Sequence, residues 1–398
     1  MAHTKAGRQE KDSDKILLST PVTHSDWRWQ YEKRIGRGKD SVKYILDCCK
    51  ERGLQRIYWR CLNGGQAVYE SQLVQHVWDV DLDPDCYAGW ATPGRNDFSY
   101  RAGRFDTLRA AVEYGHSIGL EIHAWLSINE DDHGWGAVSK FSREHPQFRW
   151  VKRCGVPYNS QLSFAFEEAR EYKLGIVKEI LSYDIDGVFF DWVRTGDIRN
   201  EPQATPDGVA DFGYEKPLVE GFQKEYGLSP VEVPNGDERW VRYRAKPQTL
   251  FMRAAHKLIK GKSKRLPISM MGAHPWYYRW AAPPVICGNL YGVLLDTETW
   301  ARERLIDEVV PAGNYAPGTT GTPEKAFAAN KREVGNHCNV WLYWWLPPTA
   351  EDFRKSIAAA ESVGARQILY WESDYLDLPE RQADAKQLAR AMREYVRG

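Results

Sequence analysis

The sequence predicts an α/β protein folded as a (β/α)8 barrel, the TIM barrel, with long loops at the carboxyl ends of its strands. Eight short apolar runs alternate along the chain with eight stretches of helical periodicity, a pattern typical of parallel strands covered by helices. Eight such units are the number that closes a barrel. No G-x-G-x-x-G motif follows the first strand, which argues against an open doubly wound sheet.

The strand predictions rest on runs of aliphatic, β-branched and aromatic residues bounded by turn signals. They cover residues 16–19, 56–60, 121–126, 188–191, 267–271, 308–311, 339–344 and 367–371. The helix predictions rest on a 3.6-residue apolar period, and Gly53, Gly119 and Gly364 follow three of these stretches as helix-ending glycines do. They cover residues 39–52, 105–118, 167–182, 242–259, 297–306, 323–334, 351–363 and 384–396. Asp296 has the position of an N-cap for the helix at 297–306.

A chain of 398 residues suits one barrel with insertions, and no linker rich in Pro, Gly or Ser divides it. We expect a flexible polar leader over residues 1–14 and a single catalytic barrel over residues 15–398. The formal net charge is zero, so nothing indicates binding to nucleic acid or to an anionic membrane.

No apolar run approaches the ~20 residues of a membrane span. The N-terminus lacks the apolar core of a signal peptide. As it stands the sequence indicates the cytoplasm, or secretion or the periplasm if a signal segment has been removed. It does not indicate an oligomeric state.

Two carboxylates come directly after apolar strand cores, Asp191 in GVFFD and Glu372 in ILYWE. An ionised carboxylate is costly to bury unless it is paired or used. In a barrel the carboxyl ends of the strands and the loops after them form the active site. Paired carboxylates are what cleavage of a glycosidic bond needs, one as the acid and the other as nucleophile or base.

Each carboxylate also has a structural interpretation. Asp191 has Arg194 or Arg60 as a candidate partner in a buried ion pair, and Glu372 has the position of a residue that caps the following turn. Other acidic residues are alternatives for the second carboxylate: Glu130, Asp131, Asp132 and Asp296.

Aromatic residues are unusually frequent, with 17 Trp and 21 Tyr, and flat aromatic rings suit the apolar faces of sugars. We expect Trp344 or Trp345 to line the pocket and Trp341 to pack, because side chains alternate along a strand. Arg60, Arg194 and Arg199 near the mouth favour an anionic glycan through bidentate contacts. The predicted substrate-binding residues are Arg60, His123, Trp125, Asn129, Arg194, His274, Trp276, Trp344 and Trp371.

A metal site is a weaker alternative. His123, His274 and Asp191 would supply three N/O ligands with an open position, but no H-x-H or H-E-x-x-H motif accompanies them. The seven cysteines have neither zinc-like spacing nor the even number of a disulfide framework. We therefore predict no metal and no cofactor.

Five stretches resemble the glycosyl-hydrolase-like family 10 barrel proteins, which are related to the former domain of unknown function 187. The match runs from about residue 16 to residue 372, and the stretch 163–194, a helix leading into Tyr-Asp-Ile-Asp-Gly and a strand ending in Asp191, is its most specific part. The stretches are 56–71 (RIYWRCLNGGQAVYES), 119–127 (GLEIHAWLS), 163–194 (SFAFEEAREYKLGIVKEILSYDIDGVFFDWVR), 212–230 (FGYEKPLVEGFQKEYGLSP) and 296–315 (DTETWARERLIDEVVPAGNY).

The resemblance implies a (β/α)8 barrel with the Asp191 strand as its fourth. Acids on strand four are key catalytic carboxylates in the related α-amylase-like and glycosidase barrels, which implies that role for Asp191. Those barrels often place the second acid after strand five, but here strand five ends in Met-Gly-Ala-His at 271–274. The second acid must then come from another loop.

We therefore predict a glycoside hydrolase that cleaves a polysaccharide or oligosaccharide. Asp191 is the predicted nucleophile or base and Glu372 the predicted acid, and the expected partner is a carbohydrate. The alternatives are a carbohydrate-binding barrel without catalysis and a metal-dependent polysaccharide hydrolase or deacetylase.

Overall fold

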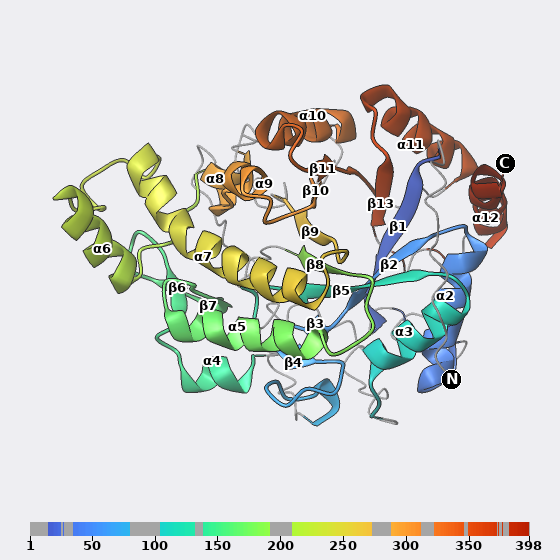
Figure 1. Cartoon of the computed structure of the whole chain (residues 1–398), viewed down its shortest axis with the longest axis horizontal. Helices are drawn as coiled ribbons and strands as arrows, with labels where there is room; N and C mark the ends of the chain where they lie inside the picture. The colour runs from blue at the N-terminus through green and yellow to red at the C-terminus, as the bar shows by residue number, and fades with distance from the viewer. Residues whose placement is uncertain are drawn as a thin grey trace.

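The protein is described by a computed structural model, in which a ring of strands is surrounded by helices (Figure 1). The predicted leader, 1–14, lies outside the described residues. The structure describes residues 15–24, 27, 35–79, 104–131, 138–191, 209–272, 288–311, 322–345, 349–371, 373, 376 and 382–397.

The central sheet is a closed parallel barrel, as predicted. β11 and β12 are separated by Trp341 alone, whose N–H donates to the carbonyl oxygen of Val309 at 3.0 Å, so the two segments form one strand. That strand pairs with β10 on one side and with β13 on the other, and β13 pairs with β1 to close the ring. The strands are β1 (Leu17–Val22), β2 (Arg56–Arg60), β5 (Glu121–Ser127), β8 (Gly187–Asp191), β9 (Ile268–Met271), β10 (Glu308–Val310), β11 (Asn339–Val340), β12 (Leu342–Trp345) and β13 (Gln367–Trp371).

A helix lies between each strand and the next, close to the predicted positions. Asp296 caps α9 as predicted, because its side chain accepts from the N–H of Thr299. That helix ends at Arg302, before the predicted end at residue 306. Arg304, just beyond the helix, has a left-handed backbone conformation with a φ of 58°. The barrel helices are α2 (Lys39–Glu51), α3 (Thr107–Ser117), α5 (Glu167–Ile180), α7 (Glu238–Lys262), α9 (Thr297–Arg302), α10 (Pro323–Val334), α11 (Ala350–Val363) and α12 (Gln382–Arg397).

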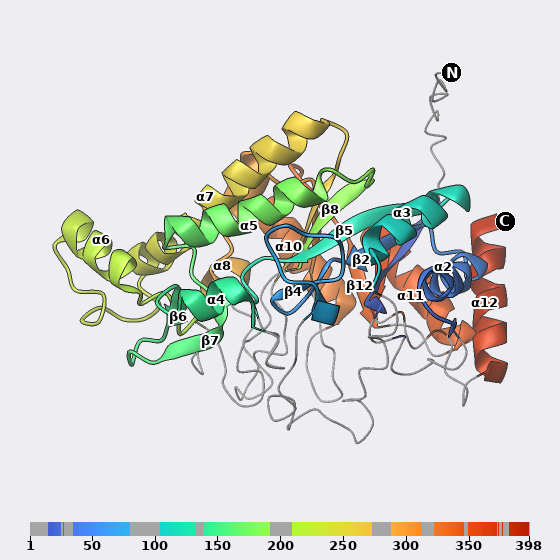
Figure 2. The ribbon, with the colours of Figure 1, turned by 90° about the horizontal axis from the view of Figure 1, so that it is seen from below.

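Insertions follow the carboxyl ends of β2, β5, β8 and β9. Figure 2 shows β4, α4, β6 and β7 on the same side of the barrel, and α6 and the start of α7 extend to the left of Figure 1 around a core that contains Phe222 and Trp240. The additional elements are β3 (Leu62–Asn63), β4 (Gln66–Ala67), the 3-10 turn η1 (Val77–Asp79), α4 (Lys140–Glu144), β6 (Arg149–Val151), β7 (Pro157–Leu162), α6 (Lys216–Tyr226) and α8 (Gly288–Val293).

Alternate hydrophobic side chains of most barrel strands enter two different cores. One set fills the barrel interior, and the other packs under the helices in the main hydrophobic core. Trp341 is fully buried in the interior set, so the expectation that it packs is confirmed. The interior set consists of Tyr58, Trp125, Phe189, Met271, Val310, Trp341, Tyr343, Leu369 and Trp371.

No helix among the described residues is long and apolar enough to cross a membrane.

Candidate functional site at the carboxyl ends of the strands

Asp191 lies at the carboxyl mouth of the barrel. It is the last residue of β8, two positions beyond the interior residue Phe189, and its strand partner is Ser127 at the end of β5. The N–H of Ile128 donates to its carbonyl oxygen at 3.4 Å. Asp191 is only 2% exposed. The strand alternation that places Phe189 inside therefore directs the Asp191 side chain toward the mouth.

Arg60 lies at the same level of the barrel, at the end of β2. Its register partner is Trp125, and the guanidinium lies over the indole at 5.0 Å from the ring centre. Nε donates to the carbonyl oxygen of Leu62 at 2.7 Å, and Nη2 lies 3.4 Å from Oε2 of Glu130. Both charged side chains are almost fully buried. Glu130 is thus a described carboxylate that the fold brings to the mouth together with Arg60.

Asn129 joins the β6–β7 hairpin to the mouth through two hydrogen bonds. Its Nδ2 donates to the carbonyl oxygen of Leu162 at 2.9 Å, and the N–H of Leu162 donates to the carbonyl oxygen of Asn129 at 2.9 Å. Among the described residues, neither its Oδ1 nor Nε1 of Trp125 has a hydrogen-bond partner, although both are buried. Leaving buried polar atoms unpaired costs free energy, so both atoms can gain from a ligand.

Aromatic rings form the floor of this region. Trp371 at the end of β13 meets Trp125 edge-on at 5.5 Å and lies 6.0 Å from Tyr343, between ring centres. Trp345, with the same strand parity as Tyr343, is 42% exposed at the end of β12. Trp344 has the opposite parity and packs against the main hydrophobic core. The structure therefore brings Trp345, and not Trp344, toward the mouth.

The structure does not bring His123 to this end of the barrel. Its strand partner is Gly187, four positions before Asp191, which corresponds to roughly 13 Å along the strands. Its ring lies edge-on to Tyr58 at 5.3 Å and is fully buried. Burial lowers the pKa of His123, because the charged form is poorly solvated there. Between His123 and the mouth lies the interior layer that contains Trp125 and Phe189.

Two of the alternative acids have structural partners. Asp131 accepts from Lys173 at 3.0 Å and from Ser139 and Ser142, all of them buried. Asp296 caps α9, as described above. Arg194, Arg199, His274, Trp276, Glu372 and Asp132 lie outside the described residues.

The described residues contain no group of three or more His, Cys, Asp or Glu side chains placed to hold a metal ion. Ser127 and Tyr343 were not among the predicted substrate-binding residues, and Trp345 was named only as the alternative to Trp344. Strand parity could have identified all three, because they share the strand faces of Trp125 and Trp371.

The family model described as Glycosyl hydrolase-like 10 matches residues 56–337, more than half of the chain. A search among curated proteins gives no match.

Solved glycosidases share the fold at low sequence identity. The catalytic domain of a β-amylase from Paenibacillus polymyxa superposes with a TM-score of 0.62 at 11% identity, covering 95% of this chain and 98% of that one. A β-galactosidase from the psychrophilic Marinomonas ef1 gives 0.56 at 14% identity, over 95% of this chain and 59% of that one. A GH42 β-galactosidase from G. stearothermophilus gives 0.58 at 11% identity, over 96% and 57%. The chain thus spans less than three fifths of the two β-galactosidases, and these likenesses establish a glycoside-hydrolase-like fold.

Proposed function

Since this chain belongs to the glycosyl hydrolase-like 10 family, we propose that it is a glycoside hydrolase that cleaves a polysaccharide or oligosaccharide. The observation that carries the proposal is the position of Asp191. It is a nearly buried carboxylate at the end of β8, the fourth strand of the barrel, beside the mouth formed by Arg60, Asn129 and Trp371. Catalytic groups of barrel enzymes come from the carboxyl ends of their strands.

In this mechanism Asp191 attacks the anomeric carbon or removes a proton from the attacking water. The second carboxylic acid protonates the glycosidic oxygen as the bond to the leaving sugar breaks. Glu372 is the proposed acid, by its position directly after β13. Glu130 is the alternative, because it is held at the mouth by Arg60.

The substrate is a carbohydrate. Trp345 offers an exposed ring to the apolar face of a sugar, and Trp371 lies beside it because the two are strand partners. Asn129 Oδ1 and Trp125 Nε1 offer an acceptor and a donor to sugar hydroxyls. Arg60 and Arg194 favour an anionic sugar, such as a uronate or a sulfated one.

A panel of neutral and anionic polysaccharides tests the proposal, with new reducing ends as the measured product. Asp191→Asn should lower kcat by about 10²–10⁴-fold while substrate binding persists. Asp384→Asn is the matched control, because this aspartate is exposed on α12, away from the mouth. Binding without turnover by the wild type would assign the chain as a carbohydrate-binding barrel. Equal activity of wild type and Asp191→Asn would remove Asp191 from the mechanism.

A further inference from the structure

A pocket of about 500 Å³ opens at the amino-terminal end of the barrel. Its floor includes Arg56, Glu121 and Glu308, the first residues of β2, β5 and β10, together with His123. Its walls come from the segments that lead into β8 and β9. Since Asp191 ends its strand and these residues begin theirs, the pocket lies at the opposite end of the barrel from the site described above. Pockets of roughly 300–1,000 Å³ hold small-molecule ligands.

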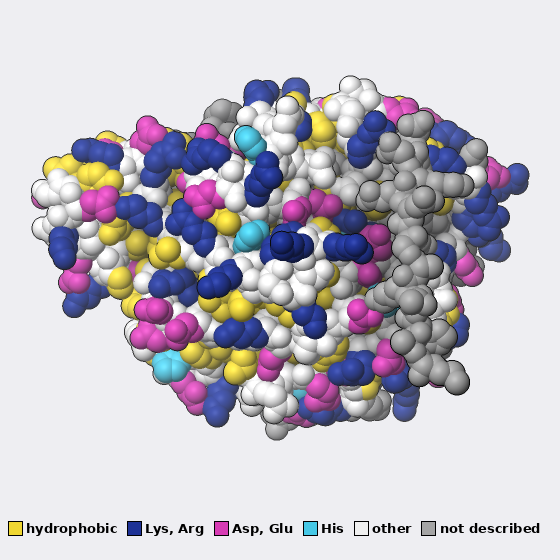
Figure 3. Space-filling view, viewed as in Figure 1, with side chains coloured by type: hydrophobic (Ala, Val, Ile, Leu, Met, Phe, Trp, Pro, Cys, Tyr) yellow, Lys and Arg dark blue, Asp and Glu magenta, His cyan; other side chains and the backbone are white. Residues whose placement is uncertain are grey.

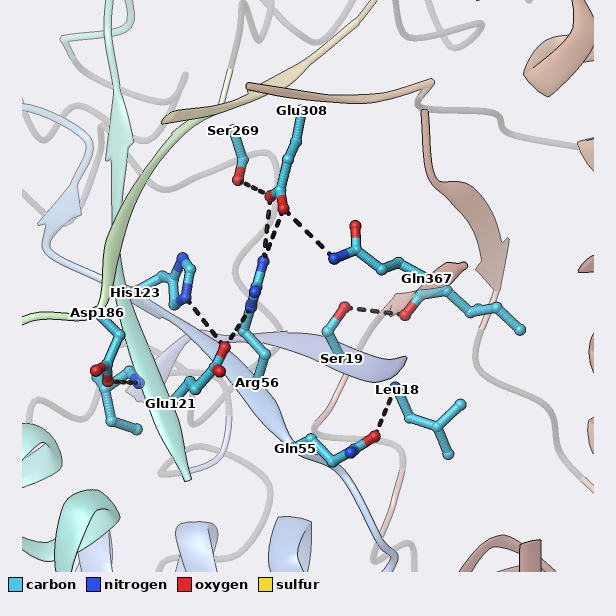
Figure 4. A network of polar contacts seen from close by, with 12 residues as sticks. Leu18, Ser19, Gln55, Arg56, Glu121, His123, Asp186, Ser269, Glu308 and Gln367 are labelled. Carbon is cyan, nitrogen blue, oxygen red and sulfur yellow. Dashed lines mark hydrogen bonds and ion pairs between the residues drawn. The ribbon is translucent and has the colours of Figure 1, made fainter. Parts of the chain in front are cut away.

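The floor of this pocket is a network of charged side chains (Figure 4). Nε of Arg56 donates to Glu121 at 2.7 Å, and Nη1 donates to both oxygens of Glu308 at 3.1 and 3.2 Å. Glu308 also accepts from Ser269 at 2.5 Å and from Gln367 at 3.4 Å. The Arg56 and Glu308 side chains are 9% and 6% exposed. Glu308 is thus fully engaged in this network.

One floor group, Glu121, keeps hydrogen-bonding capacity for a ligand. The Glu121 side chain is 40% exposed and receives Arg56 on Oε2, whereas no donor among the described residues reaches its Oε1. The imidazole of His123 is fully buried, and its Nε2 lies 3.5 Å from Oε2 of Glu121 (Figure 4). A sugar hydroxyl can donate to Oε1 of Glu121.

The rim carries two cations, Lys262 and Arg265, from the segment that leads into β9. Both are exposed, and no carboxylate among the described residues forms an ion pair with either. Asp184 and Asp186 also line the pocket, and both face His116. Asp186 accepts from Nε2 of His116 and from the N–H of Ile122, both at 2.8 Å, and the exposed Asp184 lies 3.9 Å from Nδ1 of His116. Figure 3 shows this end of the barrel, with Lys and Arg side chains beside Asp and Glu side chains.

We infer that this amino-terminal pocket is a second ligand site, for a small hydroxylated anion such as a monosaccharide that carries a carboxylate or a phosphate. The anionic group pairs with Lys262 and Arg265 at the rim, where the guanidinium suits a planar carboxylate or phosphate face. A hydroxyl donates to Glu121 on the floor. The inference does not depend on the proposed glycosidase activity, because the two sites share no residue.

Calorimetric titration of the full chain tests the inference. The probes are D-glucuronate and D-glucose 6-phosphate, with D-glucose as the neutral control and D-glucosamine as the cationic one. Wild type should bind at least one anionic sugar with a Kd at least about tenfold below that for glucose, because two charge-assisted contacts are added. The two anionic probes separate a carboxylate ligand from a phosphate ligand.

Variants locate the binding. Lys262→Ala with Arg265→Ala should raise the Kd of the anionic sugar about tenfold. Lys264→Ala is the matched control, because this lysine is exposed on the same segment but does not line the pocket; its Kd should stay within about twofold of wild type. Glu121→Gln should also weaken binding, with the melting temperature measured to verify the fold.

Three results would overturn the inference. One is the absence of anionic-sugar binding to wild type, or a preference for glucosamine. Another is an equal loss in Lys264→Ala, which would indicate a nonspecific basic surface. The third is a loss of binding in Asp191→Asn with none in the Lys262 and Arg265 variant, which would place the ligand at the carboxyl mouth.

Discussion

The imidazole of His123 on β5 packs against the α-carbon of Gly187, its partner on β8, inside the barrel. A side chain at position 187 would overlap Nδ1 and Cε1 of the ring and would come within 3.0 Å of Cγ of Pro267. Close packing on the barrel interior, and not an unusual backbone angle, therefore requires glycine at the start of this strand.

We predict that Gly187→Ala lowers the free energy of unfolding by about 2–4 kcal/mol, because one added methyl group must displace a buried ring. Gly261→Ala is the matched control. That glycine lies in the last turn of α7 with no atom near the added methyl group, so alanine should raise stability by up to about 1 kcal/mol. Urea denaturation measures both, and equal effects would refute the packing argument.

The two adjacent tryptophans of β12 should respond in opposite ways to truncation. Trp345→Ala should raise the KM or Kd for the substrate by up to about tenfold and leave stability unchanged, because an exposed stacking face is lost. Trp344→Ala should lower stability by about 2–3 kcal/mol, because Trp344 packs against the main core. Binding and thermal unfolding of both variants decide this; weaker binding in Trp344→Ala alone would reverse the assignment.

Glu215, which precedes α6, should make stability depend on pH. It is 1% exposed, neither carboxylate oxygen has a hydrogen-bond partner among the described residues, and burial raises its pKa to about 7. In the unfolded chain its pKa is about 4.3. The folded form is thus favoured while Glu215 is protonated, and this contribution is lost as the pH rises from about 4 through 7.

Glu215→Gln removes that titration. Relative to wild type, the variant should gain about 2–3 kcal/mol between pH 4 and pH 8. Glu220→Gln on the exposed face of α6 is the control and should show no such difference, since its side chain is 65% exposed. Denaturation at both pH values is the measurement, and parallel curves for wild type and Glu215→Gln would contradict the prediction.

The second acid of the proposed mechanism can be identified by how its replacement affects the hydrolysis of substrates with different leaving groups. Glu372→Gln should slow hydrolysis of substrates with poor leaving groups by about 10²-fold or more, and of aryl glycosides with activated leaving groups far less. An activated leaving group needs little protonation. The same comparison on Glu130→Gln tests the alternative acid. An equal loss on both kinds of substrate, or no loss, would exclude the residue concerned from acid catalysis.

Much of the fold could be predicted from local patterns. All eight strands lie where they were predicted, with ends that differ by at most about three residues, at Val22 of the first strand. Apolar runs between turn signals report on strands directly. The closing of the ring follows from their number. Asp191 could likewise be placed at a strand end, because it directly follows Gly-Val-Phe-Phe. Predicted helix ends were less accurate where a backbone turn intervened, as at Arg304.

The sequence by itself determined which segments are strands and which carboxylate ends the fourth one. Tertiary structure alone decided which side chains enter the barrel and how deep they lie. Both faces of a barrel strand are buried, one under helices and one inside the ring, so hydrophobic alternation does not distinguish them. Only the closed ring shows that Trp345 shares the interior face while Trp344 does not. The register between strands, which no single segment encodes, places His123 near the amino-terminal end and Asp191 at the mouth.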